Sequence, residues 1–227
     1  RALVLALGVL PFGMVYGVAV AQAGVGALPG ILGSFTIFAG ASQLSLLELH
    51  TQGAAWAIAV GTALVINARF LLYSAALAPS FAEFPPRWRF GLAHLMTDQA
   101  VTLSLIEFET EEDPRMRRGF FLGAALTLFT VWQFGTIVGI LAGTQIPEGL
   151  QLEFIIPLMF TALVVPALRD HPAIAAAVAS VTVTIIAAPL PAGTNILLGA
   201  VAGVATGAVL IDPKALDAHD PPVGPKK

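Results

Sequence analysis

The 227-residue chain has no cysteine, and only 11% of its residues are charged. The lack of cysteine excludes disulfides, thiol catalysis and iron–sulfur clusters. Soluble domains contain about 25% charged residues, so this chain has too few to cover a water-exposed surface. A net charge of −3 also provides no basic field for nucleic acid. Together with a mean hydropathy of +0.85, these values predict an all-α, polytopic membrane protein.

Sequence motifs for enzymatic chemistry are missing as well. The histidines at 50, 94, 171 and 219 do not have the spacing of a metal site. No Walker sequence, Ser/His/Asp order or H-E-x-x-H motif is present. We therefore expect no enzyme activity, no metal and no other cofactor.

A bilayer core of ~30 Å needs about 20 apolar residues of helix. Eight segments meet this length, and they are 2–23, 28–49, 54–78, 90–108, 119–142, 152–168, 172–190 and 193–211. The fourth contains His94, Asp98 and Glu107, so seven or eight crossings are predicted. We expect one transmembrane domain over 1–211 and a disordered, proline-rich cytoplasmic tail over 212–227. The apolar start directly after Arg1 suggests a trimmed N-terminus without a cleavable signal.

Lysine and arginine positions leave two orientations open. If all eight segments cross with the N-terminus inside, eight basic residues lie inside and Arg87 and Arg89 lie outside. If the fourth segment does not cross, an N-outside arrangement leaves only Arg1 outside. Both alternatives place the C-terminus in the cytoplasm.

A weak internal repeat has an offset of 122 residues. The sequence FGMVYG (12–17) matches FGTIVG (134–139), and Phe38 then aligns with Phe160. The candidate halves are 1–108 and 119–211. Duplicated halves are frequent in transporters, whose binding sites lie where the halves meet.

Glycines recur every four residues in three of the segments, namely at 13 and 17, at 135, 139 and 143, and at 199, 203 and 207. Small residues at this spacing form a groove that allows close approach of another helix. The groove either packs within the chain or, at Gly199, Gly203 and Gly207, receives a helix of a partner.

Two further segments favour broken helices. Pro11 with Gly13 interrupts the first segment, and Gly40, Ser42 and Gln43 lie in a run of small residues in the second. Such breaks free backbone groups, which then need other partners. Either these residues form a kink and interhelical contacts, or their free groups face a substrate.

Asn67 and Arg69 lie in the middle of an otherwise apolar segment. An arginine at mid-helix costs roughly 2.5–3.5 kcal/mol on insertion scales, so Arg69 should face protein or water. It either forms a fixed ion pair with Asp98 or Glu48, or binds an anionic group of a substrate through its planar fork.

The sequence HLMTDQ (94–99) places His94 and Asp98 four residues apart, on one face of a predicted helix. Thr97 and Asp98 can accept hydrogen bonds from an ammonium group, and Asp98 or His94 can carry a coupling proton. Alternatively, this segment is an interfacial helix whose polar residues are merely hydrated.

Taken in order, LPFGMVYG, FAGASQ, INARFLLYS, HLMTDQA and VWQFGTIVG resemble the AzlC family. These proteins are the large subunits of bacterial branched-chain amino acid exporters. The resemblance implies an inner-membrane exporter of leucine, isoleucine, valine and similar neutral amino acids. It also implies a small AzlD-type membrane subunit as partner, and coupling to protons. The family usually has Thr-Asp-Glu where this chain has Thr97-Asp98-Gln99, which leaves Asp98 as the single acid there.

On this basis Arg69 and Asn67 are predicted to bind the carboxylate of the amino acid. Asp98 and Thr97 are predicted to bind its ammonium group or the coupling proton. Backbone near Pro11–Gly13 and Gly40–Gln43 would add hydrogen bonds, and Phe38 with Leu44 would form the apolar part of the pocket. The alternatives are a membrane scaffold without transport activity and a channel for a small neutral solute.

Overall fold

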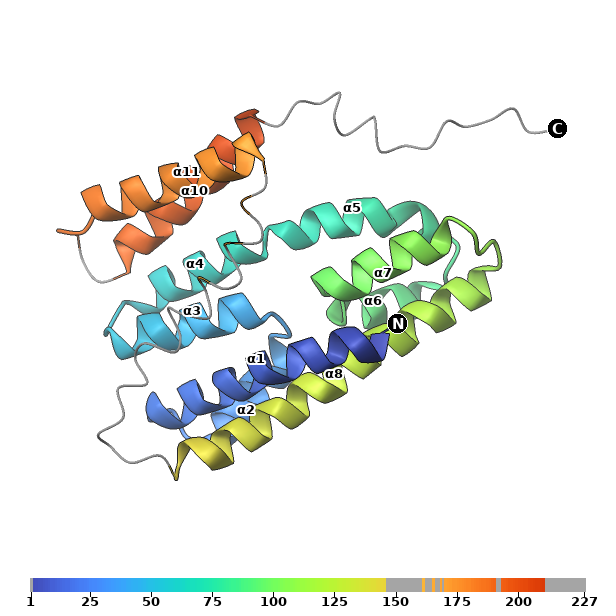
Figure 1. Cartoon of the computed structure of the whole chain (residues 1–227), viewed down its shortest axis with the longest axis horizontal. Coiled ribbons are helices and arrows are strands. Elements are labelled where there is room, and N and C mark those ends of the chain that lie inside the picture. Colours follow the sequence, from blue (N-terminus) through green and yellow to red (C-terminus); the bar gives the residue numbers. More distant parts are fainter. Residues whose placement is uncertain are drawn as a thin grey trace.

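The computed structural model describes residues 2–145, 161, 165, 168, 170–190 and 193–210. All regular elements in these ranges are helices (Figure 1). They are α1 (Ala2–Gln22), α2 (Ala27–Thr36), α3 (Gly40–Thr51), α4 (Trp56–Asn67), α5 (Arg69–Ala82), α6 (Pro86–His94), α7 (Asp98–Phe108), α8 (Pro114–Gly143), α10 (His171–Ile186) and α11 (Thr194–Leu210). Most of the predicted span 152–168 and the predicted tail 212–227 lie outside the described residues.

Two helical stretches are long and apolar enough to cross a membrane. They are Trp56–Ala82, which joins α4 and α5, and α8. α10 and α11 are apolar but shorter. The all-helical class is confirmed, whereas seven or eight crossings are not.

The predicted span 28–49 is not one helix. Ile37 and Ala39 have φ/ψ of −117/82 and −152/89, so the helix stops after Thr36 and restarts at Gly40. α2 runs from one end of the molecule toward its middle, and α3 returns to the same end (Figure 1). We call this unit hairpin A (27–51).

The predicted span 90–108 is also a hairpin, which we call hairpin B (86–108). α6 ends at His94, and α7 begins at Asp98 after the N-cap Thr97, whose Oγ1 accepts a hydrogen bond from Ala100 N at 3.2 Å. Hairpin B enters from the end opposite to hairpin A (Figure 1). The prediction that His94 and Asp98 share one helical face is therefore wrong, because the chain reverses between them.

α1 and α8 run parallel, in contact along their glycines (Figure 1). A Cβ at Gly13 would lie 2.8 Å from Trp132 O, and one at Gly135 would lie 2.8 Å from Leu10 O. The 122-residue offset of the repeat converts one of these contacts into the other, because residue 10 aligns with residue 132 and residue 13 with residue 135. The two segments matched by the repeat thus pack on each other, in accord with the predicted packing within the chain.

The predicted break at Pro11–Gly13 is wrong. α1 is continuous from Ala2 to Gln22 and includes Pro11. Gly13 faces the backbone of α8, as the contact above shows, so it serves close helix packing and exposes no free backbone group.

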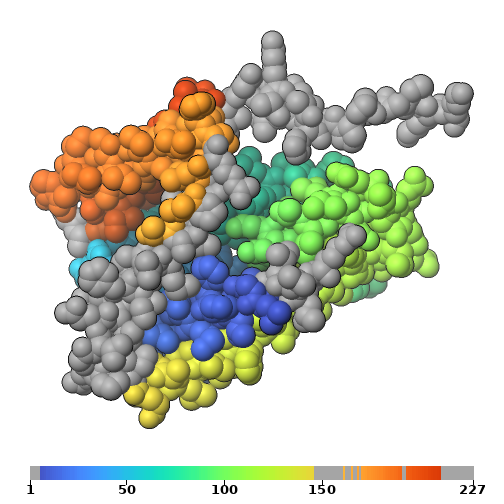
Figure 2. Space-filling view, viewed as in Figure 1, coloured from blue at the N-terminus to red at the C-terminus, as the bar shows by residue number. Residues whose placement is uncertain are grey.

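The predicted partner groove on α11 is occupied by the same chain. A Cβ at Gly199 would clash with the Thr184 side chain, and one at Gly203 would lie 3.0 Å from Ser180 Cβ. Gly207 faces Ala176 in the same way. α10 and α11 form a separate lobe, orange in Figure 2, that contacts the remaining helices through α4. Gly199, Gly203 and Gly207 therefore pack within the chain, which is the first of the two alternatives predicted for this groove.

The described arginines, apart from Arg69, gather at one end of the molecule. They are Arg87 and Arg89 on α6 and Arg115, Arg117 and Arg118 on α8. We call this the arginine-rich end. The opposite end includes the turns 23–26, 52–55 and 187–190, and its described residues include no lysine or arginine. Hairpin B therefore enters from the arginine-rich end, and hairpin A from the opposite one.

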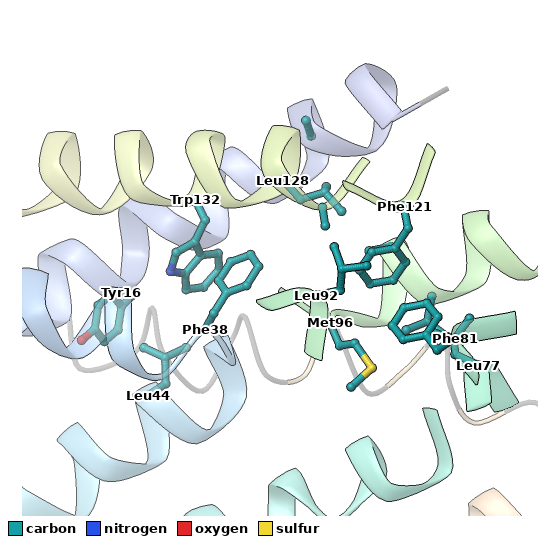
Figure 3. Packing of buried hydrophobic residues seen from close by; sticks show 14 of the residues in the cluster. Tyr16, Phe38, Leu44, Leu77, Phe81, Leu92, Met96, Phe121, Leu128 and Trp132 are labelled. Atoms are coloured by element: carbon teal, nitrogen blue, oxygen red, sulfur yellow. The ribbon is translucent and has the colours of Figure 1, made fainter. Parts of the chain in front are cut away.

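The buried core connects both hairpins to α8 (Figure 3). Phe38 of hairpin A packs edge-on against Phe129 and Trp132, with ring centroids 5.0 and 6.4 Å apart. Leu92 of hairpin B lies next to Phe121 in the same layer (Figure 3). This packing brings the tips of the two hairpins together in the middle of the molecule.

Candidate functional site: a pocket between two hairpin tips

Three interruptions of helical structure meet at one pocket of about 290 Å³. Two are the hairpin tips, and the third is the junction of α4 and α5 at Ala68. There Ala68 N and Leu71 N bond to carbonyls three residues back, at 3.1 and 3.0 Å. The lining residues are Thr36, Ile37, Phe38, Ala39, Asn67, Phe70, Ala93, His94 and Met96. The pocket therefore exposes polar groups and apolar side chains in comparable measure.

Arg69 and Asp98 form an ion pair beside this pocket. Arg69 Nη1 donates to Asp98 Oδ2 at 3.1 Å, and the two side chains are 33% and 45% exposed. The Arg69 guanidinium also lies over the ring of Phe70, 5.5 Å from its centroid. Of the predicted ion-pair partners, Asp98 is confirmed, whereas Glu48 accepts a hydrogen bond from Gln52 instead, at 2.8 Å.

The ion pair leaves hydrogen-bonding capacity unused. Arg69 Nε, Asp98 Oδ1 and Asn67 Oδ1 are buried and have no hydrogen-bond partner among the described residues. Unpaired buried polar atoms are rare because each costs roughly 1–3 kcal/mol. One donor and two acceptors near the ion pair thus lack partners within the described part of the chain, although of these three residues Asn67 is the one that lines the pocket.

Tyr73 is a residue that the sequence analysis missed. It follows Arg69 by one helical turn, and its hydroxyl interacts with the Asp98 carboxylate. Its four-residue spacing from Arg69 places both on one face of α5. That spacing was a usable signal in the sequence.

Hairpin A is fixed by buried hydrogen bonds to α8, which the sequence analysis also missed. Trp132 Nε1 donates to Ser34 Oγ at 3.0 Å, and Gln133 Nε2 donates to Ser34 O at 3.1 Å. Ser34 Oγ also lies 3.3 Å from Thr136 Oγ1. Because the break frees the carbonyls of the last turn of α2, these contacts satisfy groups that would otherwise lack partners.

The predicted residues at the start of α3 lie behind the pocket wall. Ser42 is fully buried and donates to Ala39 O at 2.9 Å. Gln43 is also buried, and its Nε2 lies 3.5 Å from Gly33 O. A Cβ at Gly40 would lie 2.5 Å from the indole of Trp132. These three residues therefore shape the tip of hairpin A, and Phe38 is the member of this group that lines the pocket.

His94 lines the pocket and joins the two tips. Its Nε2 lies 2.9 Å from Phe35 O, at the end of α2. Among the described residues, no group of three or more acidic, histidine or cysteine side chains has the arrangement of a metal site.

Comparison with known proteins supports the resemblance found in the sequence. The family profile described as AzlC protein matches residues 4–146. An uncharacterized membrane protein of Archaeoglobus fulgidus is 30% identical over 167 residues, covering 71% of this chain and 70% of that protein. A membrane protein of Helicobacter pylori strain 26695 is 29% identical over 69% of this chain and 68% of its own length. The inner membrane protein YgaZ of Escherichia coli K12 is 26% identical over 66% and 64%, respectively. No solved structure matches the chain.

Proposed function

This chain belongs to the AzlC family of membrane proteins, and from that premise we propose that it exports branched-chain and similarly large neutral amino acids. It would act as the large subunit of a two-component exporter, with a small AzlD-type membrane subunit as its partner. Protons would drive the export.

The observation that carries this proposal is the set of unpaired atoms around the ion pair. The free donor Arg69 Nε suits a carboxylate oxygen, and the free acceptors Asp98 Oδ1 and Asn67 Oδ1 suit an ammonium group. An α-amino acid presents both groups on one carbon. The unpaired atom of Asn67 is an acceptor, so we assign this residue to the ammonium group rather than to the carboxylate predicted from sequence.

The apolar walls of the pocket suit a hydrocarbon side chain. Ile37, Phe38, Phe70 and Met96 contribute these walls. A volume of about 290 Å³ is at the lower end of the ~300–1,000 Å³ typical of ligand pockets. It therefore favours a single amino acid over a peptide.

We further propose that the arginine-rich end is cytoplasmic, because short cytoplasmic loops carry an excess of lysine and arginine. Under this proposal the start of α1 and the end of α11 would also lie inside, because both point toward the arginine-rich end (Figure 1). This orientation differs from both alternatives considered from sequence, since it keeps Arg87 and Arg89 inside together with the N-terminus.

The ion pair also favours a second candidate, a scaffold in which Arg69 and Asp98 only fix the position of α5 against α7. Counterflow of leucine, isoleucine, valine and methionine in proteoliposomes, with and without the small subunit, separates the two. An exporter exchanges these amino acids and loses exchange in Asp98→Asn, while the exposed-site control Glu112→Gln stays active. A folded protein that exchanges none of these four amino acids, with or without the small subunit, would contradict the proposal.

A further inference from the structure

α6 forms one wall of the pocket but is held more loosely than the elements around it. Ala93 and His94 at its end line the pocket, as does Met96 in the tip that follows. α6 contacts α8 through Trp88, whose ring centroid lies 4.7 Å from Arg118 Cζ, but it makes no extended backbone contact with another described helix. Phe90 is 83% exposed, and a Cβ at Gly91 would meet no atom within 4 Å. Segments with few buried contacts open at low free energy.

Helical structure stops at both ends of α6, although a hydrogen bond from Arg89 Nε to Phe84 O at 2.9 Å bridges its start. It begins directly after Pro85, whose backbone is extended with φ/ψ of −56/143, and it ends in the non-helical residues 95–97. Leu92, the buried residue of this helix, inserts into the core beside Phe121 (Figure 3). Leu92 and Trp88, the two side chains of α6 that pack against the core, therefore provide an axis about which the helix can tilt.

The opposite wall of the pocket is fixed. Hairpin A is attached to α8 through Ser34, as described above, and α2 is also attached to α1 by a hydrogen bond from Tyr16 OH to Gly30 O at 3.1 Å. A hydrogen bond between His94 Nε2 and Phe35 O joins the mobile wall to this fixed one. Its loss would release the end of α6 from hairpin A.

We propose that α6 is a lid that opens the pocket toward the arginine-rich end, and that His94 is its latch. The role of the lid, admission of an amino acid, rests on the proposed function. The opening itself does not, so the two can be tested separately. Under this proposal His94 is a positioning residue, and the proton carrier predicted in this region is left to Asp98.

The first test measures opening without any substrate. Since the chain has no cysteine, Ile37→Cys places one reporter thiol in the pocket. A membrane-impermeant maleimide is applied to inside-out and right-side-out vesicles. One hydrogen bond is worth about 0.5–1.5 kcal/mol, so His94→Ala should speed labelling from the arginine-rich end about 2- to 13-fold. His50→Ala, a histidine substitution near the opposite end, should have no effect.

The second test locks the lid. In the variant carrying Ile37→Cys and His94→Cys, the leucine counterflow rate of the reduced protein is the reference, because both residues line the pocket. A short bifunctional thiol reagent should abolish that rate, and reduction should return it to the reference. The control pair Glu48→Cys with Gln52→Cys replaces two side chains that contact each other one helical turn apart, outside the pocket lining, and should keep counterflow when cross-linked. Each variant is first checked for monodisperse elution and for counterflow under reducing conditions.

Three results would contradict the proposal that α6 is a lid. They are an unchanged labelling rate in His94→Ala, faster labelling from the opposite end, or full counterflow in the cross-linked 37/94 variant. If wild-type protein shows no counterflow of any neutral amino acid, the proposed function fails, while the labelling experiment still decides whether the lid exists.

Discussion

Arg69→Lys tests whether the guanidinium does more than pair with Asp98. In the structure, the ion pair uses Arg69 Nη1 and leaves Nε unpaired. A lysine ammonium can keep one contact to the carboxylate, but it has no second nitrogen fixed in the plane of a fork. The substitution therefore preserves the link between α5 and α7 and removes the donor that we assign to the substrate carboxylate.

The expected loss follows from that one bond. A hydrogen bond to a charged group contributes about 1.5–3 kcal/mol, and each 1.4 kcal/mol corresponds to a tenfold change in affinity. Arg69→Lys should therefore raise the KM for leucine counterflow about 10- to 150-fold. The melting temperature in detergent should change little, because the ion pair and the charge remain.

The assay is counterflow over a range of leucine concentrations in proteoliposomes, with fluorescence-detected elution after heating as the measure of stability. Arg87→Lys is the matched control, because Arg87 is exposed at the arginine-rich end and should keep wild-type KM. An unchanged KM in Arg69→Lys would refute the assignment of Nε to the carboxylate. A large decrease in melting temperature would show instead that the Arg69 guanidinium is needed for the stability of the fold.

Two further predictions concern the scaffold around the pocket. Gly139→Ala places a Cβ on the backbone of α1, so it should lower stability by about 1–3 kcal/mol. Gly123→Ala, on the same helix but with open space at the Cβ position, should stabilise by up to about 1 kcal/mol. Ser34→Ala leaves Trp132 Nε1 without its acceptor and should cost about 1–3 kcal/mol. Thr127→Ala, at a half-buried position whose hydroxyl donates to Gly123 O one turn earlier, should be nearly neutral. Thermal elution profiles check all four variants, and equal melting temperatures within either pair would contradict the packing described.

The pairing of Arg69 with Asp98 could be predicted because charge is scarce. In an apolar chain, a mid-segment arginine has few possible counter-ions, and Asp98 was one of two named from the sequence. The α1–α8 contact could be predicted for a similar reason, since glycines four residues apart at 13 and 17 and at 135 and 139 leave a groove that only another helix fills so closely.

The hairpins could not be predicted from hydropathy. Ile37, Phe38 and Ala39 are as apolar as the helices on either side of them, so a window average does not detect that the chain reverses there. At the second reversal a local signal did exist. Thr97 is a favourable N-cap residue directly before α7, but its neighbours Met96 and Asp98 were interpreted as parts of one continuous segment.

The hairpins also explain which polar residues remain available for a ligand. A broken helix inside a membrane must satisfy its freed backbone groups from within the protein. Gln133 does this for the carbonyl of Ser34, and His94 does it for that of Phe35. Gln133 and His94, two polar side chains in apolar segments, thereby serve as hydrogen-bond partners for backbone carbonyls. Arg69 and Asp98 bond to each other through single atoms, and the Asp98 carboxylate also interacts with the Tyr73 hydroxyl. Arg69 Nε and Asp98 Oδ1 have no hydrogen-bond partner among the described residues, and their opposite charges make these two residues the best candidates for binding a zwitterion.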